Sequence, residues 1–170
     1  MFKETALDKL DKNLISAVRD EWMLVAAGDR ENYNMMTASW GFFGEMWGKD
    51  CAVCAVRPTR YTYSFTEAND QFALCFLGDD RETYKICGSK SGRDVNKTEL
   101  CGLTPVFSDG TVYFEECNTV IICKKLYADS LKEENFTDKS PLSFYHGDFH
   151  KLYFGEVVKV LTNVDEGLAK

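Results

Sequence analysis

The stretch Tyr33-Asn34-Met35-Met36-Thr37-Ala38-Ser39-Trp40-Gly41 decides how the rest of the chain is interpreted. Side chains alternate between the two faces of a strand, so neither face of this stretch reads as a purely apolar core face. Small residues let a flat ligand approach the backbone, and hydroxyl and amide groups can satisfy the polar edge of such a ligand. The stretch therefore predicts a strand that lines a binding site. The alternative is an edge strand that ends in a glycine-weakened aromatic turn.

Further strands are predicted on both sides of this stretch. Residues 22–27 are mostly apolar and end at the turn signal Gly28-Asp29, so we expect them to pair with residues 33–41 as a hairpin. Residues 51–56, Cys-Ala-Val-Cys-Ala-Val, are continuously apolar, which is typical of a central strand buried on both faces. The remaining predicted strands are residues 72–77, 112–114, 119–127 and 151–161.

The predicted helices are short. Apolar residues recur every three or four positions in residues 7–18, which predicts a surface helix covering the core. Pro58 suits the first turn of a second helix, which ends before Asn69-Asp70. Two more are expected at residues 81–87 and 95–100. Strands dominate and do not alternate regularly with helices, so we predict a mainly β fold, an antiparallel barrel with short α insertions, rather than a doubly wound sheet.

Composition limits the class of protein. With 170 residues and 45% hydrophobic content, the chain is expected to form a single domain, residues 1–170, with a real core. A net charge of −7 argues against sequence-independent binding to nucleic acid or to an anionic membrane. No apolar run reaches the 18 or so residues of a membrane helix, and Glu4 and Asp8 stand where a signal peptide would be basic and then apolar. We therefore expect a cytoplasmic protein.

The seven cysteines are predicted to be reduced and buried, because an odd number cannot form a complete disulfide framework. Cys51 and Cys54 have the spacing of a redox motif, but positions three apart on a strand face opposite ways. The other cysteines are scattered and the only histidines are His146 and His150, so no metal site is predicted.

Familiar catalytic and nucleotide motifs are missing from the sequence. Gly48-Lys49 lacks the remainder of a phosphate loop, and no Gly-x-Gly-x-x-Gly follows a strand. There is no Gly-x-Ser-x-Gly elbow for a charge-relay triad. These absences leave a site built from dispersed polar groups.

Three polar stretches form the candidate site: residues 34–40, 57–62 and 88–97. A helix starting near Asp94 would place Arg93 and Lys97 four residues apart, where both can converge on one anion beside the amide groups of residues 91–93. Arg57 and Thr62 add a guanidinium group and a hydroxyl group. This chemistry suits a phosphate, although an isolated basic residue is more often a solvated surface charge.

The order of these motifs resembles the flavin reductase-like family, which includes flavoredoxin. The resemblance rests on residues 34–41 (Asn-Met-Met-Thr-Ala-Ser-Trp-Gly), 57–62 (Arg-Pro-Thr-Arg-Tyr-Thr), 91–97 (Ser-Gly-Arg-Asp-Val-Asn-Lys), 102–105 and 148–157, and covers about residues 22–160. It implies an FMN-binding split β-barrel. It also implies a homodimer that holds one non-covalent FMN per subunit near the subunit interface.

The resemblance also implies which residues hold FMN. Those matching the segment along the flavin ring are Asn34, Met36, Thr37, Ala38, Ser39 and Trp40. Thr62 and Lys97 match positions that meet the phosphate or the ribityl chain, and His150 matches a histidine near the ring. Further matches are Arg57, Tyr61, Ser91 and Arg93. One departure is Asp148-Phe149-His150, since in many relatives the histidine directly follows the aspartate.

The function implied is that of an FMN-dependent oxidoreductase of the NAD(P)H:flavin reductase type. Hydride transfer to a flavin belongs to the cofactor chemistry, so no catalytic residue is demanded, and His150 is expected to assist at the flavin without being an obligatory acid or base. Two alternatives remain: an FMN electron carrier reduced by a redox partner protein, and a non-enzymatic FMN-binding dimer. No nicotinamide motif in the sequence separates them.

Overall fold

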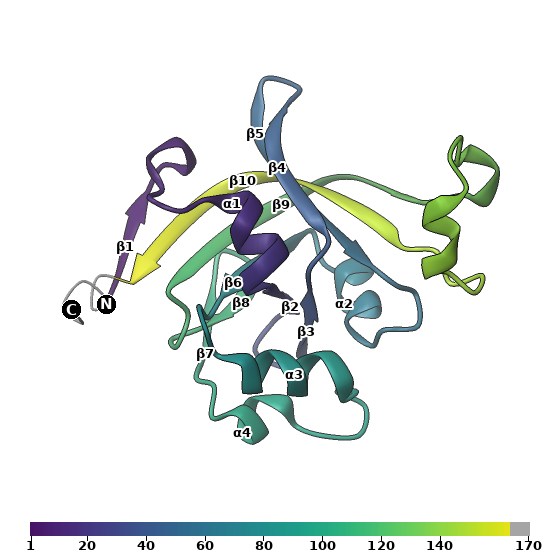
Figure 1. The fold of residues 1–170 in the computed structure, drawn as a ribbon. Helices are drawn as coiled ribbons and strands as arrows, with labels where there is room; N and C mark the ends of the chain where they lie inside the picture. The colour runs from purple at the N-terminus through teal and green to yellow at the C-terminus, as the bar shows by residue number, and fades with distance from the viewer. Residues whose placement is uncertain (164–170) are drawn as a thin grey trace.

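Antiparallel strands dominate the structure, a computed structural model in which residues 1–163 are described (Figure 1). The strands are β1 (Phe2–Thr5), β2 (Met23–Gly28), β3 (Tyr33–Ala38), β4 (Gly41–Met46), β5 (Lys49–Val56), β6 (Gln71–Phe76), β7 (Pro105–Ser108), β8 (Thr111–Phe114), β9 (Thr119–Ser130) and β10 (Lys151–Asn163). The α-helices are α1 (Leu14–Ser16), α2 (Thr62–Ala68), α3 (Arg81–Ser89) and α4 (Lys97–Cys101). A π-helical segment, Ala17–Glu21, follows α1, and 3-10 turns occupy Leu7–Lys9, Glu133–Asn135 and Ser140–Phe144.

The main sheet curls until its two ends meet. Its strand order is β3-β2-β6-β9-β10-β5-β4, with β1 paired to β10. The first and last strands of this order, β3 and β4, are joined in sequence by Ser39 and Trp40 alone. The backbone N–H of Ala55 in β5 donates to the Trp40 carbonyl at 3.3 Å, which ties this junction to the far side of the sheet. The stretch 33–41 therefore closes the barrel as well as lining it.

Two apolar clusters fill the two sides of the sheet. Alternate residues of β2 divide between them, since Met23, Val25 and Ala27 belong to one and Leu24 and Ala26 to the other. The period of two explains why the inner strands are continuously apolar in sequence. The first cluster takes in Phe65 of α2, and the second takes in Tyr84 and Cys87 of α3. Both faces of β3 contribute to the core, with Met36 packed on one side and Met35 on the other, but neither face is purely apolar, because Asn34 lies on the first and the half-buried Thr37 on the second.

Many predicted elements are confirmed. β2 and β3 form the expected hairpin, in register from Met23 opposite Ala38 to Gly28 opposite Tyr33. β5 lies between β10 and β4 and is buried from Cys51 to Val56. All seven cysteines are free thiols, and six of them are buried.

Other predictions were wrong in type or position. Residues 7–18 do not form one helix, because Leu7–Lys9 form a separate 3-10 turn and the Asn13 side chain then caps a new, short helix. The helix expected at Pro58 begins at Thr62, after a turn, and the helix expected near Asp94 begins only at Lys97, where the Asn96 side chain caps it by accepting from Glu99 N–H. Strands β1, β4 and β7 were not predicted.

The ribbon in Figure 1 shows how these elements surround the stretch 33–41. Helices α3 and α4 lie beside β3, α2 lies on its other flank, and the β4–β5 hairpin projects beyond the barrel. The segment 131–150, which links the long strands β9 and β10, forms a lobe at the opposite end from the termini. No helix in residues 1–163 is long and apolar enough to cross a membrane.

Candidate functional site

The three predicted stretches meet along β3, which is an edge strand of the main sheet. The Asn34 Nδ2 group donates to Thr62 Oγ1 at 2.8 Å, which joins the first stretch to the second. Gly92 brings the third stretch into contact, because a Cβ atom at this position would lie 2.2 Å from Asn34 Oδ1 and 3.1 Å from the Tyr61 ring. Only glycine permits this approach.

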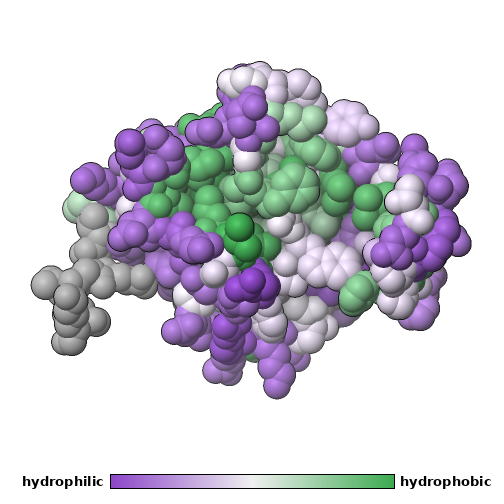
Figure 2. Space-filling view, turned by 45° about the horizontal axis from the view of Figure 1, so that its top comes forward, coloured by the Kyte–Doolittle hydropathy of each residue, from purple (hydrophilic) through white to green (hydrophobic). Residues whose placement is uncertain are grey.

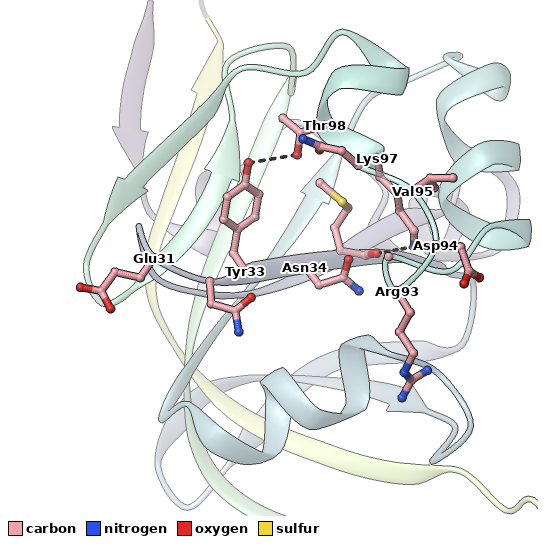
Figure 3. Close-up of a pocket in the computed structure, with 12 residues that line it drawn as sticks. Glu31, Tyr33, Asn34, Arg93, Asp94, Val95, Lys97 and Thr98 are labelled. Carbon is pink, nitrogen blue, oxygen red and sulfur yellow. Dashed lines mark hydrogen bonds between the residues drawn. The ribbon is translucent and has the colours of Figure 1, made fainter.

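A polar cavity of about 420 Å³ opens between β3 and the loop that precedes α4; we call it the loop cavity (Figure 3). Asn34, Arg93 and Lys97 are among the residues that line it. Lys97 reaches back to the strand and donates to the Met35 carbonyl at 2.8 Å and to the Cys87 carbonyl at 3.1 Å. Arg93 turns toward α2, where its guanidinium lies 4.6 Å from the centre of the Tyr61 ring. The two cations share one cavity although they do not share a helix.

Lys97 is an ammonium group held almost out of solvent, with 4% of the residue exposed. Burial is the main cause that lowers its pKa to about 8, and the nearby Arg60 charge adds to the effect, while Cys87 and Cys101 oppose it. An ammonium group has three N–H donors, and two of these are used on carbonyls. The third N–H donor has no hydrogen-bond partner among the described residues.

A second cavity, of about 280 Å³, lies along the end of β3; we call it the strand cavity. Its predicted lining residues are Met36, Thr37, Ala38, Ser39, Trp40, Arg57 and His150, and the structure adds Ala55 and Arg60. Asn34, Tyr61, Thr62, Ser91, Arg93 and Lys97 lie outside it, on or near the loop cavity. The predicted residues therefore divide between two adjoining spaces.

Arg60 connects these spaces and was not predicted as a site residue. Its guanidinium donates to the carbonyls of Gly88 (2.7 Å) and Cys87 (3.2 Å), in the last turn of α3. The Cys87 carbonyl also accepts from Lys97, so two cations meet at the end of this helix, where its dipole favours positive charge. From the sequence, a role for Arg60 at the site could have been inferred only from its position in the motif at residues 57–62, because an isolated arginine is usually a solvated surface charge.

The backbone of β3 offers further polar groups. Because the Met35 carbonyl accepts from Lys97, it points away from β2. In an antiparallel strand, the N–H and C=O of one residue point the same way, and so do those of the residue two positions on. The Thr37 backbone groups therefore face the same open edge, while the Thr37 hydroxyl donates to the Tyr84 carbonyl at 2.6 Å.

Segment 131–150 contributes His150 to the lining of the strand cavity and packs against two other lining residues, Trp40 and Arg57. The Arg57 guanidinium pairs with Asp148 and donates to the Phe144 carbonyl at 2.8 Å. The Trp40 ring packs edge-on against Phe144, with 5.3 Å between ring centres, and lies 4.8 Å from the His150 ring. These contacts fix the junction between β3 and β4 from the outside.

His150 is buried beside Trp40, and its Nδ1 atom lies 3.2 Å from the Tyr145 hydroxyl. Burial is the main cause that lowers its pKa to about 4, and the Arg57 charge lowers it further, although Asp148 acts in the opposite direction. The imidazole is therefore neutral at neutral pH and can accept or donate a hydrogen bond without changing charge.

Two expectations about this region need correction. Arg93 and Lys97 are not on one helix, since residues 92–94 form a turn and α4 begins at Lys97. The amide groups of residues 91–93 do not all face an anion, because Arg93 N–H donates to Ser91 Oγ at 3.2 Å. Within residues 1–163 there is no group of three or more His, Cys, Asp or Glu that could hold a metal ion.

Comparison with known proteins places this arrangement in a family. Residues 16–169 match the model of the flavin reductase like domain. A search of curated proteins found no match. Among solved structures, flavoredoxin from Desulfovibrio vulgaris (Miyazaki F) is similar with a TM-score of 0.67 and 19% identity, over 99% of this chain and 83% of that one.

Two further structures are similar to the chain. An FMN-binding domain of a flavin reductases-like enzyme from Shewanella baltica OS155 has a TM-score of 0.65 and 19% identity, over 95% of this chain and 77% of that one. An NADH:FAD oxidoreductase from Streptomyces globisporus, solved with NAD and FAD fragments, has a TM-score of 0.62 and 14% identity, over 84% of this chain and 74% of that one. At these identities the likeness shows a shared split-barrel fold.

Proposed function

Because the chain belongs to the flavin reductase-like domain family, we propose that it binds FMN along β3 and transfers reducing equivalents from NADH or NADPH to this flavin. The observation that carries the proposal is the pair of adjoining cavities on one edge strand. One cavity is polar, with the cations Arg93 and Lys97 beside the carboxylates of Glu31 and Asp94. The other is lined by small, hydroxyl and aromatic residues, together with Arg57 and Arg60. A flavin nucleotide combines a phosphate with a flat ring, and these two spaces match its two parts.

The strand cavity has the groups that a flavin ring needs. The open backbone edge at Thr37 can hydrogen-bond to the pyrimidine side of the ring, as can the Ser39 hydroxyl, which has no hydrogen-bond partner among the described residues. A further cavity of about 480 Å³ is also lined by residues 37–39. The Trp22 and Tyr84 side chains in its lining supply an apolar wall. The donor set therefore fits a flavin.

The loop cavity has the groups that a phosphate needs. Lys97 keeps one N–H donor, and the exposed Arg93 guanidinium makes no hydrogen bond to any residue in 1–163. Charge-assisted bonds from Lys or Arg to phosphate are among the stronger polar contacts in proteins. We propose Arg93 and Lys97 as phosphate ligands, with Thr62 and Ser91 nearby for the ribityl chain, so FMN fits better than riboflavin.

FMN, when bound, accepts hydride and passes electrons on, so the protein residues need only position it and its donor. Trp40 and Arg57 shape the outer side of the strand cavity, and neutral His150 fixes the Trp40 ring without supplying a proton. One structural neighbour is an NADH:FAD oxidoreductase, which supports a nicotinamide donor for this chain.

The test is to load the purified protein with FMN, FAD or riboflavin and to measure affinity by fluorescence quenching. The FMN-loaded protein is then mixed with NADH or NADPH under anaerobic conditions in a stopped-flow instrument. Rapid bleaching of the flavin band is expected. Tight FMN binding with an unreactive flavin would instead favour an electron carrier reduced by another protein, and absence of flavin binding would defeat the proposal.

We also propose that two copies of the chain form a homodimer. Large apolar residues are exposed on and around the β4–β5 hairpin, with Phe42 56% and Trp47 55% exposed. Phe154 of β10 lies 6.3 Å from the Phe42 ring centre and 6.4 Å from that of Trp47, so these residues form one aromatic surface. Figure 2 shows apolar residues gathered across the middle of the face that brings this hairpin forward. Exposed apolar patches mark interaction sites, and aromatic residues are enriched at subunit interfaces, so this surface supports a dimer contact.

A further inference from the structure

Cys87 and Cys101 place two thiols in contact next to the loop cavity. Cys87 is in α3 and Cys101 is the last residue of α4, and their sulfur atoms are 4.0 Å apart. A disulfide bond has sulfur atoms about 2.0 Å apart, so one side-chain rotation and a small shift of α4 would close the gap. Neither the flavin chemistry nor the predicted core role of the cysteines uses this pair.

The two thiols differ in access to solvent. Cys87 is fully buried, whereas Cys101 is partly exposed and is the only one of the seven cysteines that is not buried. Cys75 and Cys117 also lie against each other, but both are fully buried. A dissolved oxidant must reach a sulfur atom, so the Cys87–Cys101 pair is the one that the fold leaves open to oxidation.

We propose that Cys87 and Cys101 are a modification site at which a peroxide forms a reversible disulfide linking α3 to α4. The peroxide O–O bond breaks as its oxygen binds Cys101 Sγ, giving a sulfenic acid and releasing water. Cys87 Sγ then attacks Cys101 Sγ, the S–S bond forms, and the sulfenic oxygen leaves as a second water with the Cys87 proton. Two thiols and one hydrogen peroxide thus give one disulfide and two waters, and a dithiol reductant reverses the step.

The pair is mechanically connected to the proposed phosphate site. The Cys87 carbonyl accepts hydrogen bonds from Lys97 and Arg60, and Lys97 begins the helix that Cys101 ends. Drawing Cys101 toward Cys87 moves α4 relative to these carbonyls and therefore moves the Lys97 ammonium. We therefore expect the disulfide to change FMN affinity at least threefold while changing riboflavin affinity less. This expected effect on flavin affinity rests on the proposed function.

The experiment treats the full chain with a small excess of hydrogen peroxide, blocks remaining thiols under denaturing conditions, and maps peptides without reduction. A loss of 2 Da with a peptide joining Cys87 to Cys101 is expected, and dithiothreitol should reverse it. Cys101→Ser should abolish the crosslink. Cys117→Ala, which removes one member of the other close pair, should leave it in place.

Free Cys87 and Cys101 thiols after oxidation, or a crosslink only between other cysteines, would overturn the proposal. A crosslink that forms with unchanged FMN affinity would overturn the connection to the phosphate site and leave the disulfide standing. A protein that forms the crosslink but binds no flavin would defeat the proposed function alone. Mass spectrometry and flavin titration therefore separate the two ideas.

Discussion

At the scale of single residues, Arg93 and Lys97 differ in their contacts within the protein: the Lys97 side chain donates to two backbone carbonyls, whereas the Arg93 guanidinium packs on the Tyr61 ring. Arg93→Ala should weaken FMN binding by about 1–3 kcal/mol through loss of a charge-assisted bond and leave riboflavin binding nearly unchanged. Lys97→Ala should likewise weaken the binding of FMN more than that of riboflavin. It should also lower the melting temperature of the protein, because the Met35 and Cys87 carbonyls lose the Lys97 donor. Lys90→Ala, an exposed cation in the same loop that lines neither cavity, is the matched control. Equal losses for both flavins would remove either residue from the phosphate site.

Lys97 also predicts a pH dependence. Its pKa of about 8 in the folded chain means that the ammonium group loses its proton above that pH. FMN affinity should therefore fall as pH rises through about 8 to 9, and riboflavin affinity should stay level. In the absence of flavin the sign for stability is opposite: the unfolded chain holds this proton up to its ordinary pKa near 10.4, so the free protein gains stability as pH rises between these values. Titrations of both flavins across pH 7–10 measure the first pH dependence, and thermal unfolding over the same range measures the second. The Lys97→Met variant should show neither pH dependence.

His150 gives the third prediction. His150→Asn keeps a polar group of similar shape without titration, so FMN should remain bound and its reduction should slow by no more than about tenfold, or about 1.4 kcal/mol of barrier. With a folded pKa of about 4 and an ordinary value near 6.5, wild type should lose stability as pH falls between these values, and the variant should lose less. His146→Asn, at an exposed position, is the control. A fall of several orders of magnitude with FMN still bound would make His150 an acid or base.

At the scale of elements, β4 contains a built-in comparison of two glycines. A Cβ atom on Gly41 would lie 2.3 Å from the Val53 carbonyl oxygen, whereas one on Gly44 would have nothing within 4 Å. Gly41→Ala should therefore destabilise the fold by about 1–3 kcal/mol, because the backbone of β5 must move. Gly44→Ala should stay within about 0.5 kcal/mol of wild type. Chemical unfolding measures both, and equal effects would mean that β4 and β5 are not packed as described.

The same strand explains the limits of prediction from sequence. Strands β2 and β6, and the inner parts of β5 (residues 51–56) and β9 (residues 119–123), could be predicted because they are buried on both faces and therefore predominantly apolar. β4 was missed because most of it is exposed, so Gly-Phe-Phe-Gly-Glu-Met shows no simple alternation. β1 was missed because its only partner is β10, almost the whole chain away, a pairing that no local pattern reveals. The residues on β3 could be predicted because one strand positions them, but Arg60 could not, because its carbonyl partners lie in a different helix.

At the scale of the whole molecule, the exposed aromatic surface predicts the oligomeric state. The double variant Phe42→Ser and Trp47→Ser should shift a micromolar solution from dimer toward monomer and weaken FMN binding if the second chain completes the site. Leu100→Ser, at an exposed apolar position on α4 (49% exposed), is the control and should remain dimeric. Sedimentation velocity with and without FMN gives the measurement. A wild-type monomer that holds FMN tightly would contradict the prediction.

The junction at Ser39 and Trp40 has a consequence for how the molecule comes apart. The two edge strands of the main sheet, β3 and β4, are joined there by these two residues alone, so the strands cannot move far apart without moving this connection. Both residues also line the strand cavity. A ligand bound in this cavity would contact the connection itself, so a movement of the two edge strands that displaces residues 39 and 40 would also disturb the ligand. Ligand binding is therefore expected to raise the resistance of the protein to unfolding, through contacts at this connection.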